Sequence, residues 1–574
     1  MKQRIAAMLA GAFGLLAGMG TPAATSTSAT TQSAADTLVS DFVYEGLALA
    51  PVSASAAGYH IHKGVRLEGR WDDYSVAGLA RQRSFNRDLL RRLDALQHAS
   101  LDAERQADLD IVRDSVGLNL LELDRIQSFR HNPTLYVELI GNGLNNPFVL
   151  EYAPPAARYQ DIIDRLKRLP ALLSQARANL LDAPEVWNRV AREENAGNIE
   201  LIDKTLRAAV PAEQGAAFAA AAEPALRSLR DFNDYLAKTL AGKTSDWRLG
   251  KDNYERKCSY VLHIDRTPAQ LLADAEAGLT ATRAEMARLA APRSVEEALA
   301  GLASQHATAA TYMDEVRTAL AQVTEFVRQK DLLTLSARSN LAVIETPVFM
   351  RGAYGLGGFN PAPALEPQLG AFYWVTPIPA DWPSERIESK LRENNHYGLQ
   401  HLTIHEAMPG HYVQAEYSNR IEPSVRRVLR NLWGNGPYVE GWAVYTQQMM
   451  TDEGYLNSDP GLRLTYLKQL LRVEANTILD VRLQTMGMSE QEALELMTRQ
   501  TYQELQEATA KIQRAQLSSC QLDMYYAGLR GWNAARAHYQ HSHAKDYSLK
   551  KFHERALQEG PMPLPVLDRL LQRP

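Results

Sequence analysis

Cysteine is nearly absent from this 574-residue sequence, which contains only Cys258 and Cys520. Two cysteines are too few to build a disulfide-dense scaffold, so a hydrophobic core must supply most of the stability. Because the two residues lie far apart in the sequence, their distance in space is not fixed by it. A disulfide between them stays open, although two separate buried thiols are the better interpretation.

The sequence also lacks an excess of one charge and has no basic segment interleaved with aromatic residues. Its formal net charge is −5, with 22% charged and 45% hydrophobic residues, the composition of an ordinary soluble globular protein. Nucleic acid is therefore not expected as a main partner. Neither a G-x-S-x-G nor a G-x-x-x-x-G-K-[ST] element occurs, which argues against serine hydrolases of that type and P-loop enzymes.

Long hydrophobic runs are missing apart from one near the N-terminus, where Lys2 and Arg4 precede an apolar stretch over 5–19. This stretch is shorter than the roughly 20 residues that span a bilayer, and small residues follow it. The pattern predicts a cleavable signal peptide over 1–24, with an uncleaved anchor as the alternative. We therefore expect an exported protein, in a bacterial periplasm, with no stable membrane insertion after cleavage. Residues 25–37, rich in Ser, Thr and Ala, predict a disordered leader.

Most of the remaining sequence has the periodicity of amphipathic helices, for example over 76–97, where apolar residues recur at helical spacing. The pattern changes at 341–350 and 371–377, two short β-branched or aromatic segments that flank a loop rich in Gly and Pro. We predict a mainly α, large multi-helix fold with a cleft and one small antiparallel sheet (341–377). The predicted regions are an N-terminal helical region (38–265) and a second helical region (266–574) that contains the sheet.

The segment HEAMPGHYVQ, which begins at His405, nearly spells the H-E-x-x-H signature of zinc hydrolases, but Pro409 stands where the second histidine is expected. His405 and His411 are six positions apart, so a regular helix at about 100° per residue would place them on different faces. Proline lacks the N–H that a helix needs, and glycine adopts backbone angles that other residues resist. Pro409 and Gly410 can therefore bend the chain and return His411 to His405. A simple helix break with two surface histidines is the alternative.

A third ligand is offered by the segment YVEGWAVY, where Glu440 lies near the start of a predicted helix beside Gly441. Small neighbours allow a second helix to approach closely, although Glu440 could instead be a helix-start carboxylate favoured by the helix dipole. Two histidines and one glutamate, with a free position for water, form a common catalytic zinc site. We predict one Zn²⁺ ion held by His405, His411 and Glu440, with the predicted sheet next to these helices.

The segments HEAMPGHYVQ and EGWAVY resemble those of the bacterial domain-of-unknown-function family 885, and ETPVFMR and FHERALQEGPMPLPVL also match. The resemblance covers most of the mature chain and implies a relationship to glutamate-ligand (gluzincin) metallopeptidases of mainly helical fold. The family's R…PGQ-x-x-x-Y-x-x-G element corresponds to Arg514 and SSCQLDMYYAG, with Ser519 and Cys520 in place of its proline and glycine. This departure leaves the loop shape and the position of Tyr525 open.

Amide hydrolysis assigns a role to each candidate residue. A bound metal lowers the pKa of its water, and Glu406 would accept the proton of that water as general base. The tetrahedral oxyanion needs a donor, for which Tyr525 is the first choice and His396 and Tyr397 are the reserves. Buried tyrosines more commonly only satisfy a hydroxyl at the edge of a core.

Substrate contacts are expected from Arg514, Gln521, His396 and Arg351. The paired N–H donors of Arg514 or Arg351 can hold a peptide carboxylate, although structural arginines are commoner. The strand at 371–377 could be a sheet edge to which an extended peptide adds, or an ordinary core strand.

Together these residues predict that region 266–574 is a zinc-dependent metallopeptidase that hydrolyses short peptides. The alternative from another class is a non-catalytic periplasmic peptide-binding protein with a structural or vestigial metal site. A metal hydrolase of cell-wall peptides or of another amide is a third interpretation.

Overall fold

The computed structural model describes residues 23–573 apart from 97–99, 339, 352–354 and 380. The predicted signal peptide therefore lies almost entirely outside the described residues. Helix α1 (Ala23–Leu49) includes residues 25–37, so this segment is helical where a disordered leader was expected. Alanine has the highest helix propensity, and the buried side chains of Leu38 and Phe42 anchor the same helix against the rest of the protein.

Helices account for most of the described chain, which confirms the predicted mainly α fold. Many begin as capping rules require: the side chains of Asp102, Thr267 and Asn395 each accept a hydrogen bond from the backbone N–H groups of the following turn. The N-terminal helices after α1 are α2 (Pro51–Ala57), α3 (Val76–Ala95), α4 (Ala103–Leu121), α5 (Ser128–His131), α6 (Thr134–Val149), α7 (Pro155–Asn179), α8 (Glu185–Glu200), α9 (Arg207–Ala209) and α10 (Gly215–Tyr235). The later helices are α11 (Gly250–Leu262), α12 (Pro268–Ala290), α13 (Val295–Ala303), α14 (Tyr312–Gln329), α15 (Ser384–Glu393), α16 (His396–Glu406), α17 (His411–Ser418), α18 (Ser424–Trp433), α19 (Gly436–Asp452), α20 (Tyr455–Ser458), α21 (Pro460–Thr485), α22 (Glu490–Glu495), α23 (Leu505–Leu517), α24 (Asp523–Ser542), α25 (Leu549–Glu559) and α26 (Leu564–Leu571).

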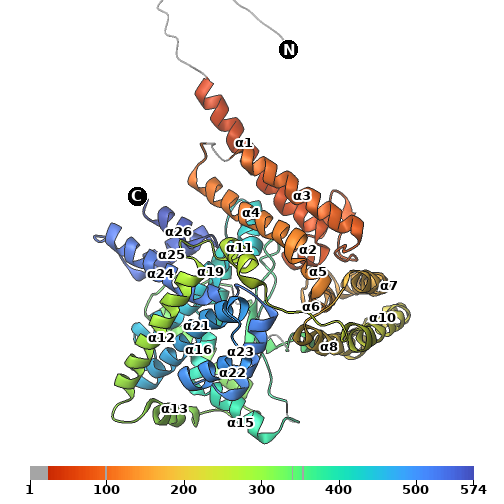
Figure 1. Cartoon of the computed structure of the whole chain (residues 1–574). Coiled ribbons are helices and arrows are strands. Elements are labelled where there is room, and N and C mark those ends of the chain that lie inside the picture. Colours follow the sequence, from red (N-terminus) through yellow and green to blue (C-terminus); the bar gives the residue numbers. More distant parts are fainter. Residues whose placement is uncertain (1–22, 97–99, 339, 352–354, 380, 574) are drawn as a thin grey trace, which may run out of the picture.

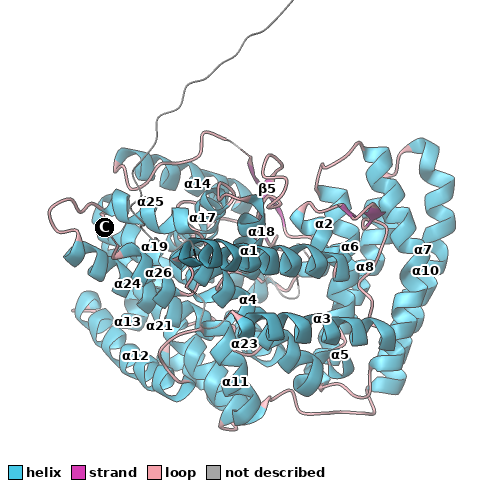
Figure 2. Ribbon diagram, turned by 90° about the horizontal axis from the view of Figure 1, so that it is seen from above, coloured by secondary structure: helices cyan, strands magenta, loops and turns pink. Residues whose placement is uncertain are grey.

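The helices enclose two main hydrophobic cores. The small core lies between α6, α7, α8 and α10, with buried residues from Tyr136 to Leu240. The large core takes side chains from both ends of the chain, from α1 to α4 and from α11 onward. Figures 1 and 2 show the helices of the small core on one side of the molecule, apart from the C-terminal helices. Helices α1, α4 and α11, which precede residue 265, pack with the C-terminal helices, and the domain boundary expected near that residue stays a prediction.

A three-stranded sheet lies within the predicted range 341–377. Strands β3 (Leu341–Glu345), β4 (Gly357–Asn360) and β5 (Ala371–Val375) are arranged in the order β3-β5-β4. Strand β5 pairs with β3 in parallel and with β4 antiparallel, so the sheet is mixed where a purely antiparallel one was expected. The reason is that β4 forms within the segment expected to be a loop and reverses the chain between the other two strands. A second, antiparallel sheet consists of β1 (Ile61–His62) and β2 (Val65–Arg66).

The strand order also corrects the predicted sheet edge. Strand β5 contains most of the segment 371–377 and is the central strand, so no peptide can add to it. Strand β4 is an edge strand, and its outer side has no strand partner in the part of the chain that the structure describes.

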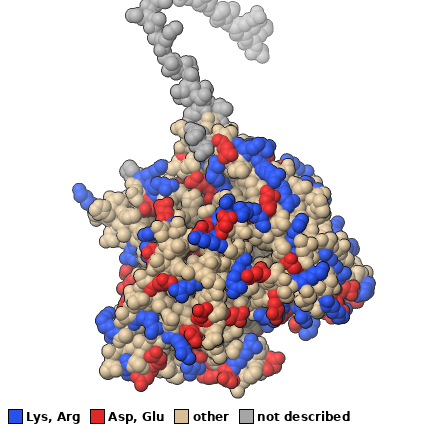
Figure 3. Space-filling model, in the orientation of Figure 1, with Lys and Arg blue, Asp and Glu red and all other residues tan. Residues whose placement is uncertain are grey.

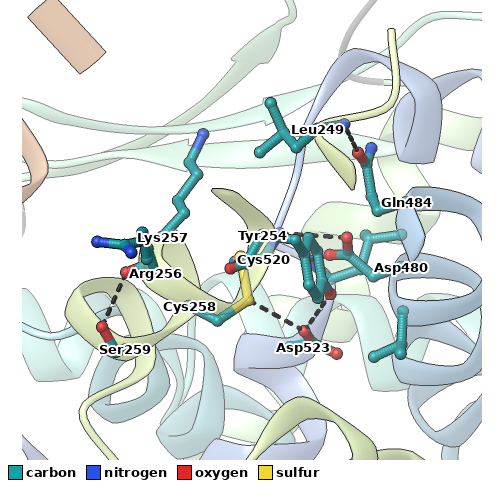
Figure 4. Close-up of a disulfide and its surroundings, with 12 residues drawn as sticks. Leu249, Tyr254, Arg256, Lys257, Cys258, Ser259, Asp480, Gln484, Cys520 and Asp523 are labelled. Atoms are coloured by element: carbon teal, nitrogen blue, oxygen red, sulfur yellow. Dashed lines mark hydrogen bonds between the residues drawn. A yellow bond between two sulfur atoms is a disulfide. The ribbon is translucent and has the colours of Figure 1, made fainter. Parts of the chain in front are cut away.

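Cys258 on α11 and Cys520, just before α24, form a disulfide (Figure 4), so the expectation of two separate thiols is wrong. Cys520 has a φ of 61°, a backbone conformation that favours glycine, and it stands where the motif described above has glycine. The carboxylate of Asp480 on α21 accepts hydrogen bonds from the backbone N–H groups of Cys520, at 3.1 Å, and Leu522, at 2.9 Å. The disulfide and this carboxylate hold the loop and thereby fix the start of α24, which carries Tyr525.

Basic and acidic side chains are interspersed over the face of the molecule in Figure 3. Within the described ranges, the structure contains no helix that combines the length and the apolar character needed to cross a bilayer.

Candidate metal centre and its cavity

The chain turns sharply between the two histidines of the motif. Helix α16 ends at Glu406 and α17 begins at His411, with a short connection between them. Within this connection, the Gly410 N–H donates a hydrogen bond of 2.9 Å to the carbonyl of Ile404. A Cβ atom on residue 410 would lie 1.9 Å from the carbonyl oxygen of His405, so only glycine fits this turn. The predicted bend is present, as a complete break between two helices.

The turn brings the three predicted metal ligands together. The imidazole centroids of His405 and His411 are 4.7 Å apart. From α19, Glu440 Oε2 lies 3.6 Å from His405 Nε2 and 3.5 Å from His411 Nε2. Two ligand atoms about 2.1 Å from one tetrahedral ion are separated by about 3.4 Å, so these spacings fit a single zinc ion. Among the residues described, these three form the one cluster of His, Cys, Asp and Glu side chains close enough to hold a metal.

The polar atoms of this cluster fit a cation. Glu440 Oε2 is buried and makes no hydrogen bond, and an unpaired buried carboxylate oxygen is costly. Burial raises the pKa of the Glu440 carboxyl, but the imidazoles of His405 and His411 outweigh it and hold that pKa well below its usual range. Glu440 is therefore ionised, and two imidazole nitrogens face the same point.

Trp442 ties the turn to the helix that supplies the carboxylate. Its indole Nε1 donates to the carbonyl oxygens of Pro409, at 2.9 Å, and Gly410, at 3.3 Å. The side chain is fully buried on α19, two residues after Glu440. One contact therefore fixes both the start of α17 and the position of Glu440. Sequence reasoning missed this role, and the only indication of it was the place of the tryptophan in EGWAVY.

A glycine contact lets α19 and α24 pack closely, as the small residue beside Glu440 suggested. A Cβ on Gly441 would lie 2.4 Å from the Cα of Gly528, and a Cβ on Gly528 would lie 2.2 Å from the Pro437 carbonyl oxygen. Gly528 is one turn beyond Tyr525 on α24. The contact thus places Tyr525 beside the metal ligands, with its ring centroid 6.3 Å from that of His405.

A cavity of about 470 Å³ opens beside the ligands, which confirms the predicted cleft. Its lining includes His405, Glu406, Arg514 and Tyr525. The start of β4 at Gly357 also reaches it. The volume lies in the range of about 300–1,000 Å³ that is usual for sites of small ligands.

Two predicted substrate contacts are connected to the tyrosine. Arg514 Nε, on α23, lies 3.4 Å from Gln521 Oε1, and Gln521 Nε2 lies 3.5 Å from the Tyr525 hydroxyl oxygen. Burial, assisted by the charge of Glu440, raises the pKa of Tyr525. Its phenol therefore stays protonated and can donate a hydrogen bond at neutral pH.

The two alternative oxyanion donors, His396 and Tyr397, lie away from the cavity. His396 is at the opposite end of α16 from His405, and its Nδ1 lies 3.2 Å from Glu315 Oε1. The Tyr397 hydroxyl donates to Asp459 over 3.2 Å. Neither side chain lines the cavity. The structure therefore does not bring His396 or Tyr397 to the predicted site.

The basic residues that line the cavity differ in part from those predicted from the sequence. Arg351 Nε donates to the Thr346 carbonyl of its own loop over 2.9 Å, and the residue does not line the cavity. Lys511 and Arg472 line it together with Arg514. Burial and these two neighbouring arginines lower the pKa of Lys511. In the sequence Lys511 and Arg472 are ordinary helix cations, so no motif could have singled them out.

The family described as "Bacterial protein of unknown function (DUF885)" matches residues 51–571. A solved structure of a proposed lipoprotein of unknown function from Shewanella oneidensis is 28% identical, with a TM-score of 0.76, and the match covers 94% of this chain and 100% of that chain. A proposed lipoprotein from Colwellia psychrerythraea is 16% identical and also has a TM-score of 0.76, with 95% and 98% covered, a likeness of fold alone. No curated protein matches the sequence.

Proposed function

This chain belongs to the DUF885 family of bacterial proteins, and we propose that it is an exported zinc metallopeptidase that hydrolyses short peptides. The observation that carries the proposal is the convergence of His405, His411 and Glu440 on one point beside a cavity. A relationship to gluzincin metallopeptidases is part of the same proposal, since this ligand set is the one they use.

The surrounding side chains suit hydrolysis of an amide. A zinc ion held by the three ligands would polarise the scissile carbonyl and supply a nucleophilic water near neutral pH. Glu406 directly follows His405 and lines the cavity, which supports a role as the base that accepts a proton and returns it to the leaving amine. The protonated phenol of Tyr525 faces the same space and is the candidate donor to the developing oxyanion.

The number of ligands favours catalysis over the rival function, a non-catalytic binding protein. Structural zinc sites usually have four protein ligands, whereas catalytic sites have three and one open position. In the part of the chain that the structure describes, the cluster has three members.

Short peptides suit the shape and charge of the cavity. The outer side of β4, which begins at the cavity wall, offers backbone groups to an extended chain. Arg514 and Arg472 offer charged donors to a peptide carboxylate. A volume of about 470 Å³ admits a few residues and excludes a folded protein.

Export is supported by three observations. The sequence begins with a stretch typical of a signal peptide, and the Shewanella and Colwellia proteins are described as lipoproteins. The disulfide between Cys258 and Cys520 is typical of an oxidising compartment.

The test compares zinc content and peptide cleavage in the wild type and in the Glu406→Gln variant. We expect one zinc per chain in both, and a loss of cleavage of at least about a hundredfold in the variant, the contribution of a general base. Mass spectrometry of a digested peptide mixture gives the cleavage rates and the product ends.

Glu440→Gln is the matched control, since it makes the same chemical change at a ligand. It should lose both zinc and cleavage. Zinc in the wild type without cleavage of any peptide would support the binding-protein alternative, and a wild type that binds no zinc would refute the proposed centre.

A further inference from the structure

An unpaired carboxylate lies on the side of the cavity that the small core supplies. Glu194 on α8 lines the cavity, is only 5% exposed, and its Oε2 makes no hydrogen bond. The charged neighbours that act on it, Glu138 and Glu193, are themselves carboxylates. Burial and the charge of Glu138 raise the pKa of Glu194 to about 9. Keeping a group in this environment costs stability, which suggests that it is retained for a ligand.

Two asparagines hold the helices that carry this carboxylate and its neighbour. Asn195, next to Glu194, donates from Nδ2 to the Leu229 carbonyl of α10 over 3.0 Å. Asn198 donates from Nδ2 to the Val137 carbonyl of α6 over 2.8 Å, and Val137 precedes Glu138. Both asparagines are buried, so α6, α8 and α10 form one rigid support. The helices that carry the two carboxylates are thus held together before any ligand arrives.

Another part of the cavity lining belongs to the C-terminal helices and carries the opposite charge. Arg472 and Arg514 lie there, beside Lys511, whose pKa is lowered by burial. The charge of Arg514 acts on Glu138, but no cation acts in this way on Glu194. The cavity lining therefore has arginines that suit a carboxylate, and two carboxyl groups of which Glu194 has no cationic partner and stays protonated near neutral pH until a cation pairs with it.

We propose that Glu194 and Glu138 form a subsite for an ammonium group of the substrate. A substrate cation would pair with Glu194 Oε2 and give this buried oxygen the hydrogen bond that it lacks. With Arg514 and Arg472 in the same cavity lining, the preferred ligand is a short peptide that has a positive group at one end and a free carboxylate at the other. That the ligand is also a substrate rests on the proposed function, whereas the ammonium subsite itself does not depend on catalysis.

The ammonium group can come from the amino terminus of a peptide or from a lysine side chain. Calorimetry with the zinc-loaded, full-length Glu406→Gln protein measures binding without cleavage. The probes are trialanine, N-acetyl-trialanine and N-acetyl-Ala-Lys-Ala. We expect trialanine to bind about ten- to a hundredfold more tightly than its acetylated form, the factor for one charge-assisted hydrogen bond. Equal affinity of N-acetyl-Ala-Lys-Ala and trialanine would assign the subsite to a side chain, and weak binding of the former would assign it to the amino terminus.

Adding Glu194→Gln should remove the preference for the charged probes and leave the affinity for N-acetyl-trialanine unchanged. The matched control is Glu193→Gln, which removes a charge from the neighbouring, exposed residue of α8 and should preserve the preference. The melting temperature of the Glu194→Gln protein should be close to that of its parent, because a carboxyl group that is protonated near neutral pH is replaced by an amide of the same shape. A preference that survives Glu194→Gln, or a failure of every cationic probe to bind, overturns the proposal. Neither result depends on whether the wild type cleaves peptides. The binding experiment therefore tests the ammonium subsite, and the cleavage experiment tests the proposed function.

Discussion

Two carboxylate oxygens at the candidate metal centre and its cavity lack a hydrogen bond. Glu440 Oε2 and Glu194 Oε2 are both buried without one, as are other atoms elsewhere in the described chain, among them Asn419 Oδ1. Each such atom costs about 1–3 kcal/mol of stability that a ligand can recover. The protein therefore gives up folding free energy at the positions where we propose that it binds zinc and substrate.

His553 shows the opposite arrangement, a buried imidazole with both nitrogens paired. Its Nδ1 lies 2.8 Å from the Leu332 carbonyl oxygen and must donate, so its Nε2 accepts from the Tyr445 hydroxyl at 2.9 Å. Burial lowers the pKa of His553 to about 4. The residue belongs to the FHERALQEGPMPLPVL segment, and its role in this structure is to support the core behind Trp442.

This pairing predicts an acid-sensitive contribution to stability. Because the folded-state pKa lies below the unfolded value of about 6.5, the contribution is complete above pH 6.5 and is lost as the pH falls toward 4. Between pH 7.5 and 5 the wild type should lose about 2 kcal/mol more unfolding free energy than His553→Gln, in which this group cannot titrate. Denaturant unfolding at the two pH values measures the difference, in which all other titrating groups cancel. Equal pH dependence of the two proteins would contradict the assignment.

Single residues differ in how far the sequence reveals them. His405, His411 and Glu440 could be predicted because zinc ligands are of few types and the motif is local. Trp442 and Glu194 could not, since their importance comes from a carbonyl and an empty space that only tertiary packing creates.

Among the secondary-structure elements, the break between α16 and α17 decides whether the histidines meet. Gly410→Ala would place a Cβ against two backbone oxygens, those of His405 at 1.9 Å and Ile404 at 2.3 Å. The turn must then open, and we expect zinc affinity to fall at least about tenfold and the unfolding free energy to fall by about 2–4 kcal/mol. Zinc titration and denaturant unfolding measure the two effects.

Gly301→Ala on α13 is the control, because a Cβ there meets no atom within 4 Å. It should leave zinc affinity unchanged and raise stability by up to about 1 kcal/mol, since alanine is the better helix former. Unchanged zinc affinity in Gly410→Ala would show that the turn does not position His411.

The helices could be predicted from periodicity because their hydrogen bonds are local. The sheet could be located but not its strand order, since β4 has the sequence GGFN, which has little intrinsic preference for a strand. It forms because it can pair with β5, and such pairing depends on the whole fold.

For the molecule as a whole, the disulfide joins residues 262 positions apart, and the segment between them contains all three proposed metal ligands. In the chain-entropy account, closing a loop of this size destabilises the unfolded state by about 5 kcal/mol. The Cys258→Ala/Cys520→Ala double variant should therefore unfold at a lower denaturant concentration, and its stability should no longer respond to a reducing agent. Unfolding curves with and without reductant test this, and a wild type that is equally stable in both conditions would show that the bond adds nothing.

The two cores have a consequence for substrate length. The proposed metal ligands belong to helices of the large core, and the proposed ammonium subsite belongs to helices of the small core. The distance between the peptide bond that reacts and the ammonium group that is bound therefore depends on how these two sets of helices pack against each other. A shift of the small-core helices relative to the large-core helices would then change the length of peptide that the protein cuts, without changing any residue that contacts the peptide.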